Sequence, residues 1–229
     1  VTGDADFSVG TLDAGSIKVS GTQTLHHPVV LGRDLTLDGG NITVLGNVNG
    51  QNHNLTIKAP VTMGSNGNQT WTNVKNLLVY SPANLNLASV QANVKASFYQ
   101  PITLLSNASI SAPSLNILSN IIGNNYNLTL SGTTVNLGST GAETLSAVNQ
   151  FSVTGALNNY LASIHTAGPQ NYFGTVNLFN PVDINGTQIE FHQPIAGNSN
   201  DFTLAGNVTF DGALNQLNNL ALTGSTVFN

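Results

Sequence analysis

The sequence of 229 residues contains no cysteine, which excludes a disulfide framework and a thiolate site. Charged residues make up only 7% of the chain, far below the roughly 25% that is usual for globular domains. No apolar run reaches the roughly 18 residues that a membrane-spanning helix needs, so no membrane insertion is expected. The net charge of −5 lacks the basic footprint of nucleic-acid binding, so no nucleic-acid partner is expected.

The first ten residues, VTGDADFSVG, have neither a basic start nor an apolar core, so they are not expected to be a signal peptide. A secreted protein whose signal has been removed, or a piece of a larger chain, would look the same. Hydrophobic residues nevertheless make up 40% of the chain, which excludes a disordered polar polymer. A chain of this composition builds its surface from neutral hydrogen-bonding side chains rather than from ions.

One segment of the sequence occurs three times. It reads GQNHNLTI at 50–57, GNNYNLTL at 123–130 and GNSNDFTL at 197–204. The similarity extends on both sides of these segments. It predicts a single β-solenoid over residues 1–229, made of three units of about 69–74 residues and the start of a fourth: 7–76, 77–150, 151–219 and 220–229.

A shorter phrase, a polar residue followed by apolar-x-apolar, occurs ten times, for example as NLTI at 54–57. Apolar-x-apolar is the period of a β-strand, and the turn residues Gly, Asn, Asp and Ser separate the phrases. The spacing of the phrases predicts three turns in each unit, two short and one long. The expected fold is therefore an all-β parallel solenoid of about ten turns, a rod on the order of 45–50 Å long. A β-sandwich would not show ten like phrases in like order, and three units are too few for a propeller.

Eight of the ten phrases begin with Asn or Asp. Side-chain amides stacked at one corner of successive turns hydrogen-bond to each other and to the turn backbone. The sequence therefore predicts a structural ladder formed by Asn54, Asn76, Asn107, Asn127, Asp201 and Asn219. A glycine lies four residues before the ladder position in each copy, where a backbone bend with positive φ is expected: Gly50, Gly123 and Gly197.

Residues 22–69 and 165–214 resemble the repeats of filamentous-haemagglutinin-type proteins, which are secreted by a two-partner system. The similar phrases are TQTLHHPVVLGRDLTLDGGNITVLGNVNGQNHNLTIKAP and HTAGPQNYFGTVNLFNPVDINGTQIEFHQPIAGNSNDFTLAGNVTF. The resemblance implies a right-handed parallel β-helix that forms the shaft of a secreted or surface-anchored bacterial adhesin. It also implies an extracellular location on the bacterial cell surface.

Few residues point to chemistry, and no catalytic residue, metal site or cofactor is predicted. Glu190 and His192 lie two apart on an expected strand and point outward together, where a solvated ion pair is favoured over general acid–base catalysis. His26 and His27 are adjacent, so they face opposite sides of a strand and do not easily chelate one ion.

Surface recognition is the remaining class of function. Exposed aromatic rings stack on sugars, and the candidates for such a glycan contact are Trp71, Tyr99 and Tyr172. Two N-glycosylation sequons lie in turn-like sequence, at Asn68 and Asn185.

The chain begins and ends at the same phase of its repeat, without the polar cap that closes most solenoids. This favours either a segment of a longer array, with neighbouring repeats as partners, or subunits that stack end to end. The favoured function is a non-catalytic structural shaft of an adhesin or extracellular fibre. The alternatives are a self-assembling filament subunit, a module that binds host or environmental glycans, and an enzyme acting on polysaccharides.

Overall fold

The fold was analysed in a computed structural model that describes residues 3–7 and 10–229. The phrase expected at 6–9 extends into residues 8–9, which lie outside the described residues. The described chain is all β, with no helix, and the strand pairs are parallel. The chain winds into stacked coils that form a β-solenoid, as the sequence predicts. The right-handed sense implied by the resemblance stays a prediction.

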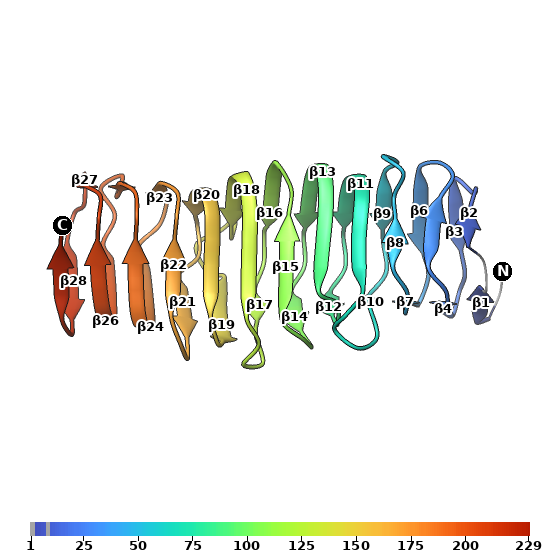
Figure 1. Cartoon of the computed structure of the whole chain (residues 1–229), viewed down its shortest axis with the longest axis horizontal. Helices are drawn as coiled ribbons and strands as arrows, with labels where there is room; N and C mark the ends of the chain where they lie inside the picture. The colour runs from blue at the N-terminus through green and yellow to red at the C-terminus, as the bar shows by residue number, and fades with distance from the viewer. Residues whose placement is uncertain (1–2, 8–9) are drawn as a thin grey trace. The chain divides into compact units, whose positions relative to one another are not determined.

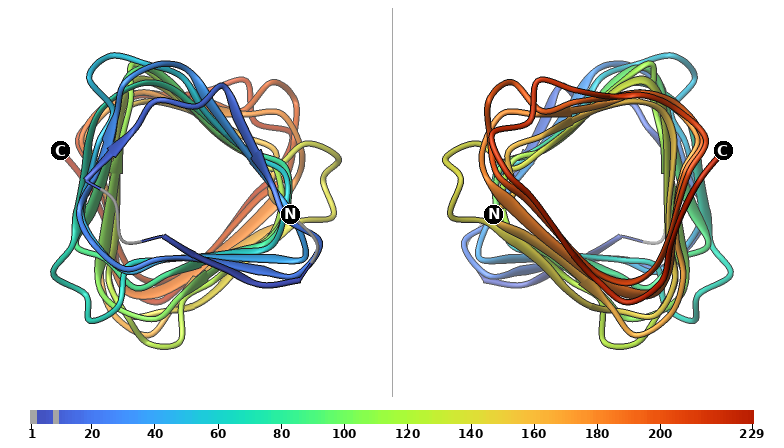
Figure 2. Two further views of the ribbon diagram at one scale, coloured as in Figure 1. Left: turned by 90° about the vertical axis from the view of Figure 1, so that its right-hand side faces the viewer. Right: turned by 90° about the vertical axis from the view of Figure 1, so that its left-hand side faces the viewer.

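The chain comprises two compact units, residues 1–114 and 115–229. Inside each unit the coils follow one another in chain order (Figure 1), and each coil has three sides (Figure 2). We call these sides the first, second and third face, in the order in which the chain passes them. A strand of one coil pairs with the strand 18 to 24 residues later, on the same face of the next coil.

In the first unit, three columns of strands form the three faces. The first face contains β1 (Ala5–Phe7), β4 (Thr22–Leu25), β7 (Asn41–Val44), β10 (Val61–Met63), β12 (Ala83–Leu85) and β14 (Ile102–Leu104). The second contains β2 (Thr11–Leu12), β5 (Val29–Leu31), β8 (Val48–Asn49), the first parts of β11 (Thr70–Val79) and β13 (Ser89–Phe98), and β15 (Ala108–Ser111). The third contains β3 (Ser16–Lys18), β6 (Leu35–Asp38), β9 (Leu55–Ile57) and the later parts of β11 and β13.

The second unit is built in the same way. Its first face contains β17 (Ile121–Ile122), β19 (Thr144–Val148), β21 (Ser163–Thr166), the first parts of β24 (Val182–Phe191) and β26 (Phe202–Phe210), and β28 (Leu220–Thr223). The second contains the first parts of β18 (Leu128–Leu137) and β20 (Phe151–Asn159), then β22 (Gln170–Tyr172), the later parts of β24 and β26, and β29 (Thr226–Phe228). The third contains β16 (Ser114–Ile117), the later parts of β18 and β20, β23 (Val176–Leu178), β25 (Ile195–Ala196) and β27 (Leu214–Asn215).

Side chains along each strand point alternately inward and outward, and the inward ones fill the interior of the solenoid. In β9, Leu55 and Ile57 are buried and Thr56 between them faces out, as the apolar-x-apolar period of the phrase at 54–57 predicts. The same inward position recurs in register on the neighbouring coils, because Leu55 pairs with Leu35 on one side and Leu77 on the other. Each inward side chain thus stacks on similar ones, so burial of apolar surface and the backbone ladder act in the same direction.

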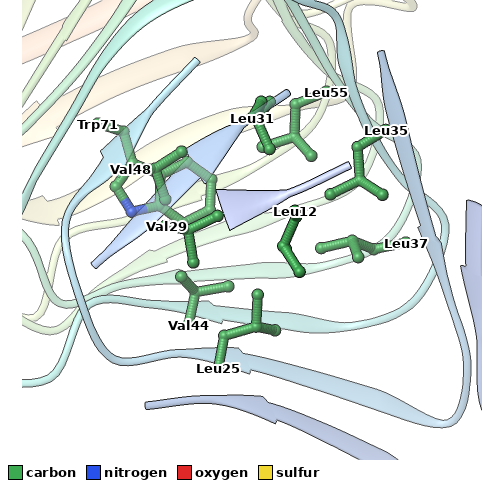
Figure 3. Close-up of a pocket in the computed structure, with 10 residues that line it drawn as sticks. All are labelled: Leu12, Leu25, Val29, Leu31, Leu35, Leu37, Val44, Val48, Leu55 and Trp71. Atoms are coloured by element: carbon green, nitrogen blue, oxygen red, sulfur yellow. The ribbon is translucent and has the colours of Figure 1, made fainter. Parts of the chain in front are cut away.

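Figure 3 shows the interior of the first unit, where apolar side chains from all three faces converge. The cavity between them measures about 10 Å³, room for no more than one water molecule. Trp71 lines it and is fully buried, and its Nε1 has no hydrogen-bond partner. A stable water needs two or more polar partners, and no other polar side chain lines the cavity.

The number of turns is about twelve rather than the ten expected. The coil that contains β12 and the coil that contains β21 have none of the ten phrases, so a prediction based on the phrases gave two coils too few. From β9 to the first part of β18 the chain passes eleven strand segments, and it passes eleven more to reach β26. Each repeat of about 73 residues therefore covers three and two-thirds coils, not three.

Because eleven is not a multiple of three, the repeated phrase changes face from copy to copy. Within the second unit, the copy at the start of β18 lies on the second face and the copy at the start of β26 on the first. Whether residues 1–229 form one solenoid with unit boundaries at 76, 150 and 219 stays a prediction.

The turn after each repeated glycine has the same geometry in all three copies. Contrary to expectation, Gly50, Gly123 and Gly197 do not have positive φ. Glycine is required there because a Cβ would lie within 2.5 Å of Val74 Cα, within 2.4 Å of Val148 Cα and within 2.8 Å of the Gln216 carbonyl oxygen, respectively. Left-handed φ values fall instead on the next two residues, namely Gln51, Asn52, Asn124, Asn125, Asn198 and Ser199.

The coil that faces each of these turns also carries a left-handed residue: Asn73, Ala147 and Gln216. The carbonyl of each accepts a hydrogen bond from the turn, for example from the N–H of Asn125 to Ala147 at 2.6 Å. Ala147 has no side chain that compensates the left-handed conformation locally, unlike the asparagine in the first copy. The strain is held in place by the contact between coils.

Replacing Ala147 with glycine should therefore stabilise the fold by about 1 kcal/mol, since its φ of 54° suits glycine. The urea midpoint at constant m-value measures the change. Ala142→Gly is the matched control, because Ala142 is also exposed and does not have positive φ. It should lower the midpoint. An equal effect of the two substitutions would contradict the explanation from backbone strain.

Candidate functional site

Polar ladders run between the coils, but at several corners rather than one. In the first unit, Asn76 Nδ2 donates to Asn54 Oδ1 at 2.7 Å, and Asn54 Nδ2 donates to Asp34 Oδ2 at 2.7 Å, before the third face. Asn107 occupies the equivalent position before β15, on the second face. Asn54 and Asn76 are thus ladder residues, whereas the place of Asn107 in a ladder stays a prediction. The expectation of a single corner is wrong because the repeat advances by eleven strand segments.

In the second unit the predicted ladder positions lie at two different corners. Asn149 Nδ2 donates to Asn127 Oδ1 at 2.9 Å before the second face. Asn219 and Asn218 both donate to Asp201 Oδ1 at 2.8 Å before the first face. Acids are tolerated at such places because neighbouring amides donate to them. In the first unit, the backbone N–H and then the side chain of Asn54 hold the pKa of Asp34 below its usual value.

A longer ladder on the third face of the second unit was missed from the sequence. Asn136 donates to Asn116 at 2.7 Å, Asn158 to Asn136 at 2.8 Å and Asn177 to Asn158 at 2.9 Å, each from Nδ2 to Oδ1. These residues lie between two buried residues in LNI, VNL, LNN and VNL, and the flanking residues are apolar except for Asn159. The signal that could have found it is Asn in the central place of the strand phrase, whereas the predicted ladder positions lie before the phrase's first apolar residue.

Removing the inner member of this ladder should cost more stability than removing the end member. Asn158→Ala breaks two side-chain hydrogen bonds and Asn177→Ala breaks one, so we expect losses of about 2 and about 1 kcal/mol. Chemical denaturation of the two variants measures both values. If both variants lose the same free energy of unfolding, the asparagine side chains do not form a continuous ladder of hydrogen bonds.

Two loops share the pattern G-S-x-G-x-Glu/Gln: Gly64–Gln69, which stands out from the coils after β10 (Figure 1), and Gly138–Glu143. Their glycines have φ values of 79–88°. The last side chain folds back and accepts from the loop. Glu143 accepts from the hydroxyls of Ser139 and Thr140 at 2.8 Å and from three backbone N–H groups, and Gln69 Oε1 accepts from two.

Partial burial alone would raise the pKa of Glu143, but the hydrogen bonds donated by Thr140 and Ser139 outweigh it and lower the pKa to about 2 from 4.5. A carboxyl with a depressed folded pKa stabilises the fold fully above its unfolded pKa and loses that contribution as the pH falls through the folded value. This loop should therefore weaken in acid.

Glu143→Gln, which copies the sequence of the other loop, should remove this pH dependence. The stability advantage of the wild type over Glu143→Gln should be constant near neutral pH and shrink between about pH 5 and pH 2. Thermal unfolding at a series of pH values measures the difference. If the difference does not change with pH, Glu143 is not the group responsible.

The aromatic residues proposed for glycan contact do not form a surface platform. Trp71 and Tyr172 are 0% and 1% exposed, so neither offers a ring to a sugar, and this expectation is corrected. Both point inward because they occupy inward positions of β11 and β22. The Tyr172 hydroxyl donates to the buried Gln170 at 2.7 Å, and burial raises the pKa of Tyr172.

Tyr99 is half-buried, and one face of its ring is covered by Tyr80, with centroids 4.7 Å apart and an interplanar angle of 4°. Similar stacks join Tyr160 to Phe179 and Phe173 to His192 in the second unit. Rings that stack on each other have less free face for a sugar. The sequon residues Asn68 and Asn185 are both exposed, and glycosylation at them stays a prediction.

The structure brings Glu190 and His192 together, as the sequence predicts, and adds residues that the sequence did not indicate. His192 Nε2 lies 3.6 Å from Glu190 Oε2, and His192 Nδ1 lies 2.8 Å from Asp211 Oδ2 on the next coil. A hydrogen bond from Asn229, and next one from His192, hold the pKa of Asp211 below its usual value. Asp211 lies nineteen residues after His192, one coil away, and that spacing is the signal that could have found it.

His26 and His27 are both exposed, and His26 Nε2 lies 3.5 Å from Asp6 Oδ1. In the described part of the chain, no group of three or more His, Asp and Glu side chains could hold a metal ion. No helix in that part is long and apolar enough to cross a membrane. No family model, curated protein or solved structure matches the chain.

Proposed function

We propose that the chain is a non-catalytic structural module, the shaft of a secreted or surface-exposed bacterial adhesin or extracellular fibre. The observation that carries the proposal is that the same stabilising interactions repeat from one coil to the next inside each unit. Backbone pairing, stacked apolar side chains and carboxamide ladders repeat from coil to coil. Carboxamide ladders and stacked aromatic pairs also join one coil to the next.

The composition supports an extracellular structural role. Neutral amides and hydroxyls cover the coils in place of ions, so the contacts depend little on salt. The resemblance of residues 22–69 and 165–214 to filamentous-haemagglutinin-type repeats favours a bacterial cell surface. Its partners would be neighbouring repeats of the same chain.

The alternative is a self-assembling subunit that stacks end to end. Leu220, Leu222, Val227 and Phe228 are 36–61% exposed in β28 and β29. A further coil on these strands, whether of the same chain or of a second subunit, would bury them. A mass that does not change with concentration in sedimentation velocity would remove this alternative. Glycan binding is less supported, because Tyr99 alone among its three candidates reaches the surface.

The test removes one coil in phase. Deleting residues 163–182 takes out twenty residues, the spacing between Ile164 and Ile184, so the faces on either side stay aligned. Deleting residues 55–76 removes one coil of the first unit in the same way, because Leu55 pairs with Leu77. Deleting only 163–172 is the matched control, which puts the faces out of phase.

A shaft should tolerate the loss of any one coil, so both in-phase deletions should keep cooperative unfolding and display on the bacterial surface. The out-of-phase deletion should lose both. Antibody labelling of intact cells and thermal unfolding of the purified chains provide the two measurements. Loss of display after just one in-phase deletion, with folding intact, would indicate a unique site and contradict the structural role.

A further inference from the structure

His192 belongs to a series of side-chain contacts that runs through four successive coils of the second unit. Phe173 on the preceding coil stacks on the imidazole, with centroids 4.8 Å apart and an interplanar angle of 9°. Oδ2 of Asp211, on the following coil, lies 2.8 Å from Nδ1, and Asn229, one coil further on, donates to Asp211 at 2.7 Å. Of these three contacts, the one between His192 and Asp211 joins two ionisable groups.

A second carboxylate faces the other nitrogen of the ring. Oε2 of Glu190 lies 3.6 Å from Nε2 of His192. Among the described residues, the ionisable groups that pair with His192 are thus Glu190, two residues earlier on the same coil, and Asp211 on the next coil. The preceding coil contributes the uncharged ring of Phe173. The imidazole therefore lies between two acids, and the sequence of the second unit contains no lysine or arginine that could compete for them.

The charge of the imidazole decides how many of these contacts are favourable. An ionised carboxylate only accepts hydrogen bonds, so in the neutral ring Nδ1 carries the hydrogen toward Asp211 and Nε2 turns a lone pair toward Glu190. Both nitrogens of the protonated ring carry a hydrogen, so each carboxylate then has a donor and an opposite charge beside it. The stack on Phe173 also favours the cation, since the face of an aromatic ring attracts positive charge.

Asp211 is ionised throughout the range in which imidazole changes its charge. A hydrogen bond from Asn229, and next one from His192, hold the pKa of Asp211 below its usual value. Imidazole side chains change charge between about pH 5 and about pH 8. Acidification within this range therefore adds a proton to a histidine and leaves the carboxylate beside it charged.

The pairing of a histidine with an acid of the neighbouring coil recurs along the chain. Four of the five histidines lie within 3.6 Å of such an acid, although the chain contains only ten acids. The pairs are His26 with Asp6, His53 with Asp34, His165 with Asp183 and His192 with Asp211. Within the described part of the chain, His192 is the one histidine that has two acidic partners.

We propose that His192 acts as a proton-dependent clamp between successive coils: once protonated, its imidazole bridges Glu190 and Asp211 and ties the coil of β24 to the coil of β26. When the ring is neutral, the bond to Asp211 stays and the contact with Glu190 is lost, because Nε2 then has no hydrogen to donate. Gln188 donates to Glu190 and is a positioning residue. The clamp is independent of the structural role proposed above, since the backbone pairing of the coils does not need it.

The direction of the pH effect follows from the charge. The folded corner favours the protonated imidazole, so its contribution to stability is present in mild acid and is lost as the pH rises through about pH 5 to pH 8. The contribution of Glu143 has the opposite direction and a different range, because it is lost as the pH falls below about 5. The two effects therefore do not overlap.

Hydrogen exchange of the full chain, followed by NMR at about pH 5.5 and about pH 8, tests the proposal. The reporters are the backbone amides of Asp211 and Asn229, which donate to the carbonyls of Phe191 and Phe210 on the preceding coils. After correction for the exchange rates of unstructured peptides, their protection in the wild type should be about threefold higher at the lower pH. In His192→Gln the protection should be the same at both pH values.

Glu190→Gln distinguishes a bridge from a simple pair. It should lower the ratio of the two protection values without abolishing it, since Asp211 remains beside the ring. The wild type also gives a readout that needs no variant. In ¹⁵N-resolved spectra of the ring, Nε2 of His192 should lose its hydrogen as the pH rises, whereas Nδ1 should keep it.

His165→Gln is the matched control, because it removes the other histidine of the second unit, which lies 3.1 Å from Asp183, and leaves this corner unchanged. Its reporters should keep the wild-type ratio. Circular dichroism confirms that each variant is folded. Equal protection at both pH values in the wild type, a wild-type ratio in His192→Gln or Glu190→Gln, loss of the ratio in His165→Gln, or a hydrogen on Nε2 of the neutral ring would each overturn the proposal.

Discussion

The backbone hydrogen bonds between successive parallel coils are the constraint on which the rest of the structure depends. They fix the spacing of neighbouring coils at about 4.8 Å, and they continue through the corners as well as the faces. The N–H of Tyr80, for instance, donates to the carbonyl of Ile57 at 2.9 Å just beyond the strands. At this spacing equal side chains stack on one another, so each position along a coil selects residues that stack well with copies of themselves.

That constraint explains why the chain uses amides where other proteins use ions. Like charges stacked one coil apart repel each other, whereas a carboxamide donates on one side and accepts on the other. The ladder from Asn116 to Asn177 is built in this way. Asp34 and Asp201 occur where neighbouring asparagines donate to them, and neither stacks directly on another acid. The low charge of the sequence thus follows from the geometry of the coil.

The sequence was sufficient to predict the fold class, the strand period and the inward positions, because these depend on local alternation. Leu55 and Ile57 are examples. The number of coils was wrong, because a count of phrases does not reveal which face each phrase occupies. Positive φ was expected at Gly50 and fell on Gln51 and Asn52, because the close approach of the neighbouring coil, not the bend, demands glycine. The contact between Asp211 and His192 joins two successive coils. Predicting it from the sequence would have required the exact number of residues in that coil.

The advance of eleven strand segments has a consequence for how such a chain can grow. A tandem duplication in a gene needs to add a whole number of strand segments to stay compatible with the core, and it does not need to add a whole number of coils. Inward positions are alike on all three faces, so a duplicated segment fits wherever it falls. A repeat of this length rotates its outward side chains to a new face each time. The outward residues of one repeated phrase therefore do not stack on their own copies.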